Sequence, residues 1–161
     1  MKEERYTVLM SVYYKEKPAY LKTSIESMLN QTIPPDEFVI VKDGPLSKEL
    51  DAVIDMFIDK NPGLFTIIEN KVNLGLGPAL AKGILASRNS LIARMDSDDY
   101  SVNTRCEKQL KEFEKDSALE MVGTFEVEFI DNIENVISIH SVPETDSEIR
   151  KFMRRRCAVL H

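Results

Sequence analysis

The sequence of 161 residues has few of the side chains that build metal centres or disulfide frameworks. Its two cysteines are Cys106 and Cys157, and its two histidines are His140 and His161. These residues form neither a CxxC pair nor a histidine-rich metal site, and two cysteines make no disulfide framework. The composition therefore favours a reducing compartment.

Long apolar runs are also absent from the sequence. No run approaches the ~20 residues that span a bilayer, and the start, MKEERYTVLM, carries acidic residues where a secretory signal would be basic and then apolar. We therefore expect a cytoplasmic protein.

The chain has no excess of positive charge. Its 21 basic and 27 acidic side chains give a net charge of −6. General attraction to nucleic acid or anionic lipid is therefore disfavoured, and we expect no nucleic-acid partner. A local run of three arginines at residues 154–156 favours a solvated helix end, with a phosphate or membrane patch as the alternative.

What the sequence does contain is an alternation of apolar segments and helical patterns, with 43% apolar residues. Apolar runs typical of buried strands occupy residues 7–13, 38–41, 65–69 and 90–95. Helical patterns begin near Pro18, Ser47 and Pro78 and lie between those runs. The alternation predicts an α/β fold with a mainly parallel, doubly wound sheet.

One helical face and the C-terminal pattern complete the expected fold. In the helix that begins at Pro78 we expect Leu80, Ala81, Ile84 and Leu85 to face inward. After residue 100 the pattern predicts a helix near 103–115 and two antiparallel β stretches, 120–130 and 135–140, joined by a turn at Asp131-Asn132.

The last helix is expected after Thr145. Thr145 and Glu148 have the spacing of a capping box, and Ile149, Phe152 and Met153 are expected to face inward. We expect one structural domain overall, with residues 1–100 forming one half and residues 101–161 the incomplete start of the other.

Polar residues follow each predicted parallel strand, at the edge where ligands of open α/β sheets bind. They occupy residues 13–16, 43–44, 73–77 and 96–99. Asp96 and Asp98 point the same way in an extended segment, so two carboxylates converge. Such a pair is suited to Mg²⁺ or Mn²⁺ completed by substrate phosphates. A solvated, helix-capping turn is the alternative for an isolated D-x-D-D sequence.

Two further features near this edge remain open to two interpretations. Asn73 and Gly75 precede a helix whose free N–H groups would attract phosphate, although a tight turn alone explains the glycines. Arg94, near the end of a buried strand, needs an anionic partner, either a nucleotide phosphate or a neighbouring aspartate, unless its side chain is directed to the surface.

Four segments together resemble the nucleotide-diphospho-sugar transferases of glycosyltransferase family 2, which have the GT-A fold. They are residues 7–32, 35–45, 71–84 and 91–116. The sequence of these segments is most similar to that of bacterial members that build exopolysaccharide, capsule or O-antigen. The resemblance implies a Rossmann-like GT-A fold with a small antiparallel addition after the DxD motif formed by Asp96 and Asp98.

The same resemblance assigns nucleotide-binding roles by position. Tyr13 would stack on the base, and Glu16 would lie near the base or ribose. Asp43 would accept a hydrogen bond from the imide N–H of uracil, which makes UDP the expected carrier. Lys82 would point from the third helix toward the nucleotide.

The resemblance also assigns the metal site. Asp98 would bind Mn²⁺ or Mg²⁺ directly and bridge to both phosphates, while Asp96 would meet the ribose and assist the metal. Asp99 would cap the following segment. Two departures from the family's pattern affect the base contacts, namely Tyr14 where asparagine is common and Pro45 in place of serine.

The implied reaction is a single inverting displacement, in which an acceptor hydroxyl attacks the anomeric carbon as nucleoside diphosphate leaves. The acceptor would be a glycan or a lipid-linked sugar, which would bring the protein to the cytoplasmic face of the inner membrane as a peripheral protein. The family's general base lies well downstream of the DxD motif, so we expect it beyond His161 and expect this chain to be truncated.

Other functional classes share parts of the pattern. A catalytically silent nucleotide-sugar binding module would need only the donor site. A nucleotidyltransferase would carry a glycine-rich loop after the first strand, where this chain has VYYKEK. A phospho-receiver domain would need an acidic pair there, and this strand ends in tyrosine.

Overall fold

The computed structural model describes residues 5–130 and 133–158. The elements in chain order are β1 (Tyr6–Val12), α1 (Pro18–Leu29), β2 (Glu37–Lys42), α2 (Lys48–Lys60), β3 (Phe65–Glu69), α3 (Leu76–Ala86), β4 (Leu91–Asp96), α4 (Arg105–Lys115), β5 (Glu126–Phe129), β6 (Val136–His140) and α5 (Asp146–Phe152). This order confirms the predicted α/β alternation and the β-rich addition after residue 100. The chain divides into two compact units, one ending at Leu110 and one beginning at Lys111.

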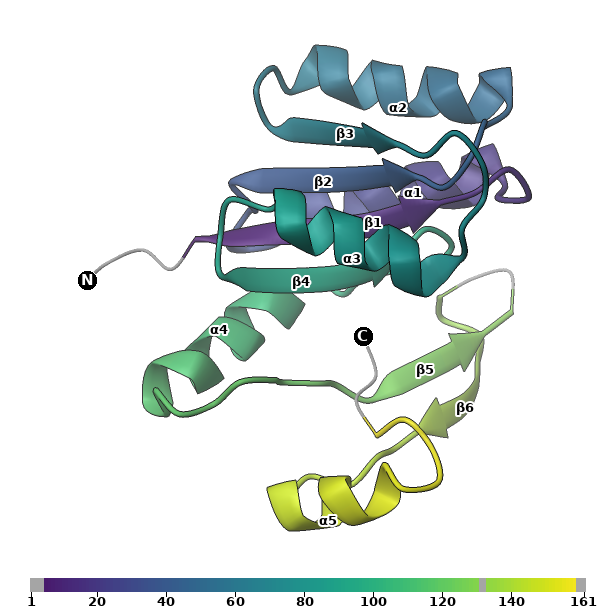
Figure 1. Cartoon of the computed structure of the whole chain (residues 1–161). Helices are drawn as coiled ribbons and strands as arrows, with labels where there is room; N and C mark the ends of the chain where they lie inside the picture. Colours follow the sequence, from purple (N-terminus) through teal and green to yellow (C-terminus); the bar gives the residue numbers. More distant parts are fainter. Residues whose placement is uncertain (1–4, 131–132, 159–161) are drawn as a thin grey trace. The chain divides into compact units, whose positions relative to one another are not determined.

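The first unit is built on a four-stranded parallel sheet with strand order β3-β2-β1-β4. The chain proceeds outward from β1 to β3 and then returns to place β4 on the other side of β1 (Figure 1). The direction of winding therefore reverses between β1 and β4. Ligands of open parallel sheets bind beyond the carboxyl ends of the strands at such a reversal.

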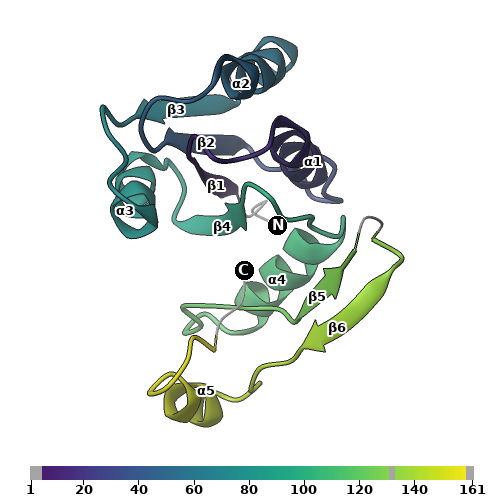
Figure 2. The same ribbon diagram turned by 90° about the vertical axis from the view of Figure 1, so that its right-hand side faces the viewer.

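Helices cover both faces of this sheet. Figure 2 shows α1 and α2 on one side and α3 on the other. Alternate residues of β1 serve the two sides: Val8 and Met10 join the larger core, whereas Leu9 packs with Val39 and Val41 in the smaller core beneath α3. Burial on both faces explains why the strands are apolar without alternation.

The inward face of α3 differs from the prediction. The helix begins at Leu76, two residues before Pro78, and its buried residues are Ala79 and Gly83. Leu80 packs against the smaller core as expected, but Ala81 is exposed, Ile84 is 52% exposed and Leu85 is 88% exposed, so the expectation that these three face inward is wrong. The physical reason is close packing, because a Cβ at Gly83 would overlap Leu9 Cδ1. Small residues, and not large apolar ones, let this helix approach the sheet.

The second unit contains the antiparallel pair β5 and β6, as predicted, with Val127 opposite Ile139. Strand β5 begins at Glu126, later than the predicted residue 120. The predicted turn at Asp131-Asn132 lies outside the described residues.

The last helix also differs from its prediction. Thr145 is the N-cap residue of α5, but its hydroxyl donates to Glu148 Oε2 at 2.7 Å and caps no backbone N–H. No residue of α5 is buried, and Met153, just after it, is 51% exposed, so the expected inward face is not formed. A helix of seven residues beside a two-stranded ribbon has little surface to bury.

Candidate functional site

A cavity of about 580 Å³ opens at the carboxyl ends of the parallel strands in the first unit. Four segments contribute its lining, each extending from the end of one parallel strand toward the element that follows it. The lining residues are Ser11, Tyr13, Lys15, Glu16, Lys17, Tyr20, Asp43, Asn73, Gly75, Leu76, Asp96, Ser97 and Asp98. The cavity therefore lies where the reversal of strand order places a ligand site.

Most of the residues singled out from the sequence meet in this cavity. Those in the lining are Tyr13, Glu16, Asp43, Asn73, Gly75, Asp96 and Asp98. Lys82 and Arg94 are not part of it. Lys15 and Ser97 lie in the polar segments expected at this edge, but the sequence assigned them no role. The pattern did not indicate Ser11, Lys17 or Tyr20, which also line the cavity.

Asp43 is the most constrained of the cavity residues, with 3% of its surface exposed. Its Oδ1 accepts hydrogen bonds from Asn70 Nδ2 at 2.8 Å and from the N–H of Leu74 at 2.9 Å, and its Oδ2 accepts from the N–H of Gly75 at 2.9 Å. The carboxylate thus holds the loop between β3 and α3 in place. The N–H of Gly75 is bonded to Asp43, so it is not one of the free helix-start donors expected from the sequence.

These bonds also set the charge of Asp43. Burial alone would raise the pKa of its carboxyl, but the donors from Leu74, Asn70 and Gly75, together with the nearby Lys82 ammonium, hold the pKa below its usual value. Asp43 is therefore an ionised acceptor at neutral pH.

The glycine after Asp43 packs closely against the same loop between β3 and α3. Gly44 has φ of +93°, and a Cβ there would lie 2.9 Å from the backbone nitrogen of Asn73. Only glycine combines that backbone conformation with such a close approach. The loop that carries Asn73 and Gly75 is therefore held by both Asp43 and Gly44.

Glu16 links the loop after β1 to the loop after β4. Its Oε2 accepts a hydrogen bond from the Ser97 hydroxyl at 2.6 Å, and Ser97 stands between Asp96 and Asp98. The bond fixes the Glu16 carboxylate beside the two aspartates.

Asp96 is held by two contacts at the end of β4. Its backbone carbonyl accepts a hydrogen bond from the Ser24 hydroxyl of α1 at 2.7 Å, and its Oδ1 pairs with Arg94 Nη2 at 2.8 Å. Of the partners that the sequence offered for Arg94, the structure shows the neighbouring aspartate.

Asp98 lies in an environment unfavourable to its own negative charge. Partial burial raises the pKa of its carboxyl, and the nearby carboxylates of Glu16 and Asp96 raise it further. Converging carboxylates of this kind are stabilised by a hard divalent cation, so the donor set fits Mg²⁺ or Mn²⁺. Within residues 5–130 and 133–158, no group of three or more His, Cys, Asp or Glu side chains is arranged to hold a metal ion by itself.

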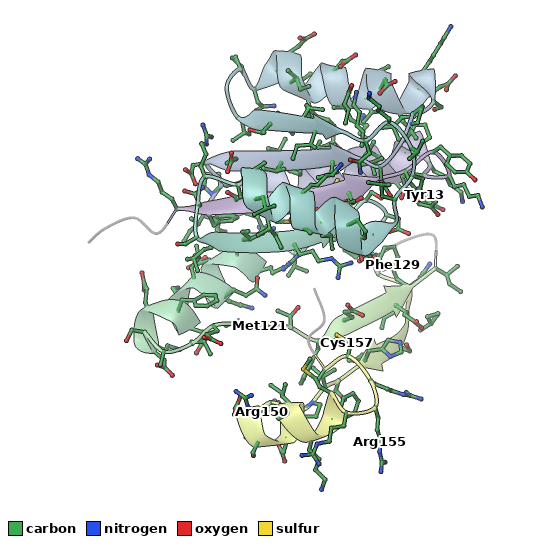
Figure 3. All side chains as sticks on the ribbon, in the orientation of Figure 1. Tyr13, Met121, Phe129, Arg150, Arg155 and Cys157 are labelled. Atoms are coloured by element: carbon green, nitrogen blue, oxygen red, sulfur yellow. The ribbon has the colours of Figure 1, made fainter. Side chains whose placement is uncertain are left out.

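The rim of the cavity is aromatic and basic. Tyr13 is 42% exposed beyond the end of β1, where Figure 3 labels it, and its ring meets Tyr14 edge to face at 5.9 Å. Lys17 lies over the Tyr20 ring at 4.5 Å. An exposed ring can stack on a planar ligand, and lysines beside it favour an anionic one.

The second unit carries a separate basic segment. Lys151, Arg154, Arg155 and Arg156 are exposed and border a cavity of about 690 Å³ together with Pro143, Glu148 and Phe152. Arg155 is labelled beside α5 in Figure 3. Among the helices in the described ranges, none has the length and apolar character that crossing a bilayer requires.

Comparison with known proteins begins with a family match. Residues 7–159 match the sequence profile described as "Glycosyl transferase family 2". A Haemophilus influenzae protein named an uncharacterized glycosyltransferase is 36% identical over 98% of this chain and 58% of its own length. An Escherichia coli protein named UDP-Gal:alpha-D-GlcNAc-diphosphoundecaprenol beta-1,3-galactosyltransferase is 32% identical over 98% of this chain and 56% of its own length. The chain thus spans little more than half of these relatives.

Solved structures support the fold. Staphylococcus aureus TarS, residues 1–349 in complex with UDP, matches with a TM-score of 0.60 at 17% identity, over 69% of this chain and 32% of that one. The mannosyltransferase PcManGT from Pyrobaculum calidifontis, in complex with GDP-Man and Mn²⁺, matches with a TM-score of 0.58 at 20% identity, over 74% of this chain and 34% of that one. The expected GT-A fold is confirmed.

Proposed function

Because this chain belongs to glycosyl transferase family 2, we propose that it forms the donor-binding part of an inverting glycosyltransferase that uses a UDP-sugar. The observation that carries the proposal is the cavity itself, in which an exposed tyrosine, a buried ionised carboxylate and a pair of aspartates come together. The tyrosine would stack on a base, the buried carboxylate would accept a hydrogen bond from an imide N–H, and the aspartates would hold a metal ion bound to a diphosphate. A UDP-sugar carries all three groups.

The choice of UDP is supported by the hydrogen-bonding capacity of Asp43. A carboxylate oxygen accepts about two hydrogen bonds, and Oδ1 already has donors from Asn70 and Leu74. Oδ2 has one from Gly75 and keeps room for one more. Uracil offers a single imide N–H, whereas guanine offers two adjacent donors that suit both oxygens of a carboxylate.

The charged end of the donor is expected at Asp96 and Asp98. These two residues would hold Mn²⁺ or Mg²⁺, which when bound would neutralise the charge that develops on the departing diphosphate. Arg94 holds the Asp96 side chain, and Ser97 holds Glu16, so the carboxylates are positioned before a ligand arrives. Positioned groups lower the barrier by reducing the reorganisation needed during the reaction.

We propose a glycan or lipid-linked acceptor, with the general base outside this chain. The printed name of the Escherichia coli relative includes a diphosphoundecaprenol acceptor, and the exposed basic segment at residues 151–156 suits an anionic membrane surface. Retention on phosphatidylglycerol vesicles would support this interpretation. It is contradicted if replacing Arg154, Arg155 and Arg156 by glutamine leaves that retention unchanged.

A catalytically silent donor-binding module is the second candidate, because the roles proposed for the cavity residues all concern the donor and none is a general base. The two candidates differ in turnover: transfer of sugar to a defined acceptor by the complete protein supports the enzyme, and tight binding without transfer supports the module.

The test of donor binding is calorimetry of UDP with and without Mn²⁺. We expect Mn²⁺ to tighten UDP binding, and the variant Asp98→Ala to remove most of that gain. Asp55→Ala, which deletes an exposed carboxylate of α2 that does not line the cavity, is the matched control and should behave as the parent. Equal metal dependence in all three proteins contradicts the assignment of Asp98.

A further inference from the structure

Asn70 occupies a buried position behind the cavity, directly after β3, with 5% of its surface exposed. Its Nδ2 donates to Asp43 Oδ1 at 2.8 Å, and its Oδ1 accepts from Lys82 Nζ at 2.5 Å. The backbone N–H of Asn70 donates to the carbonyl of Lys42 at 2.9 Å. Asn70 is therefore fixed by the backbone and lies between a cation on α3 and the anion after β2.

The direction of the Asn70 amide follows from its two partners. An ammonium group can only donate hydrogen bonds, and a carboxylate can only accept them. The carbonyl oxygen of the amide must therefore face Lys82, and its NH₂ group must face Asp43. Lys82 lies outside the cavity lining, and in this structure it acts on Asp43 through Asn70 and through its charge.

We propose that Asn70 is a positioning residue that restricts Asp43 to one open acceptor site, on Oδ2, and thereby sets the preference of the cavity for a base with a single imide N–H. The inference rests on the proposed function. Without the Asn70 amide, Oδ1 would regain an acceptor site and the carboxylate could pair with two adjacent donors.

Charged groups lie on the segments around this network. Lys42 at the end of β2 pairs with Glu69, the residue before Asn70, at 3.1 Å. Lys82 on α3 is the one whose charge acts on Asp43. The other charged residues of the cavity lining, from the loops after β1 and β4, are Lys15, Glu16, Lys17, Asp96 and Asp98. None of these is altered in the experiment below, so their contribution to any pH dependence is common to all variants.

The experiment uses Asn70→Asp, which keeps the shape of the side chain, and Asn70→Ala, which removes the amide. Asn89→Ala is the matched control, because the Asn89 amide also donates to a carboxylate, Asp36 Oδ1 at 3.2 Å, at the opposite end of the sheet. Calorimetry with Mn²⁺ present gives the Kd of UDP and of GDP from pH 5 to pH 8. Hydrogen exchange of the Leu74 and Gly75 amides reports the loop without nucleotide.

In Asn70→Asp, two carboxylates face each other, and one shared proton can replace the lost N–H donor at low pH. We expect its UDP affinity, relative to the parent, to fall by about tenfold or more as the pH rises from 5 to 8, because a hydrogen bond to a charged group is lost. The Leu74 and Gly75 amides should exchange faster over the same range. In Asn70→Ala we expect the ratio of GDP to UDP affinity to rise severalfold, and in Asn89→Ala no change.

The outcomes separate this inference from the function on which it rests. If the parent protein binds no UDP, the proposed function fails, and the base preference fails with it. If the parent binds UDP but Asn70→Asp follows the parent's pH profile, or Asn70→Ala keeps the parent's GDP to UDP ratio, only the role of Asn70 is overturned. Circular dichroism establishes that each variant is folded before its pH profile or its GDP to UDP ratio is interpreted.

Discussion

Two buried carboxylates mark the two ends of strand β2. Glu37 begins the strand and is fully buried, and Asp43 follows its last residue. Glu37 accepts hydrogen bonds from the Thr7 hydroxyl at 2.6 Å and the N–H of Arg88 at 2.7 Å, and it pairs with Arg88 Nε at 3.1 Å. Each carboxylate is stabilised by donors at its own end of the sheet, so one secures the framework and the other shapes the cavity.

Glu37 should make the free energy of unfolding depend on pH. Burial would raise its pKa, but the donors from Thr7 and Arg88 and the Arg88 charge hold the pKa below the ordinary value of 4.5. A carboxyl group whose pKa is lowered by folding contributes its full stabilisation at pH values above its pKa in the unfolded chain. That stabilisation is lost as the pH falls through its pKa in the folded protein. The loss therefore begins below about pH 4.5.

We expect Glu37→Gln to lower the free energy of unfolding by about 2 kcal/mol at pH 7, because buried donors lose a charged acceptor. Urea denaturation at several pH values checks both points. The variant should lose less stability than the parent between pH 5 and pH 3. Parallel pH curves for the two proteins would contradict this account of Glu37.

We expect Gly44 to affect ligand binding through its close packing against Asn73 as well as through its backbone conformation. Gly44 and Gly63 both have positive φ, +93° and +83°, but only a Cβ at Gly44 meets a neighbour, the backbone of Asn73. Alanine at either position costs roughly 1 kcal/mol of backbone strain. We expect Gly44→Ala also to weaken UDP binding, because it displaces the loop that Asp43 holds, and Gly63→Ala to leave the Kd of UDP unchanged. Calorimetry in which both variants bind like the parent would refute this.

At the scale of elements, helix α3 shows how packing overrides a pattern of large apolar residues. Its buried positions, Ala79 and Gly83, lie four residues apart on one face. A Cβ at Gly83 would overlap Leu9 Cδ1 and lie 3.1 Å from Val41 Cγ2, whereas a Cβ at Gly77 would meet nothing. The closeness of helix and sheet therefore depends on one glycine.

Substituting the two glycines of α3 by alanine should have unequal effects. Gly77 lies in the first turn directly before Pro78, whose ring disfavours a helical residue with a Cβ at that position, so Gly77→Ala should bring no more than about 0.5 kcal/mol of change. Gly83→Ala should destabilise the protein by about 1–3 kcal/mol, because overpacking outweighs the helix preference of alanine. Thermal unfolding measures both. A stabilised Gly83→Ala protein would show that the sheet can yield to the helix and would contradict the packing described.

The elements themselves were predictable from local patterns, and their contacts were not. Unbroken apolar runs and proline or serine at helix starts located four strands and three helices, and the position of polar residues after strands located the cavity. Asn70 was missed because its role depends on Lys82, which comes from a different element. The inward face of α3 was predicted wrongly because hydrophobic spacing does not show how closely a helix approaches its sheet.

At the scale of the whole chain, the cavity residues all belong to the first unit, which ends at Leu110. The chain spans 58% of the length of the Haemophilus influenzae relative and 56% of the length of the Escherichia coli relative. We therefore propose donor recognition for residues of this chain and the transfer step for the complete protein.

The central claim is that one ligand joins the base-binding end of the cavity to the aspartate pair. A crystal structure of the protein with UDP and Mn²⁺ tests it directly. We predict uracil against Tyr13 with its imide N–H on Asp43 Oδ2, and the cation between Asp98 and the diphosphate. A nucleotide bound elsewhere, or a cation that has no contact with Asp98, would contradict the account.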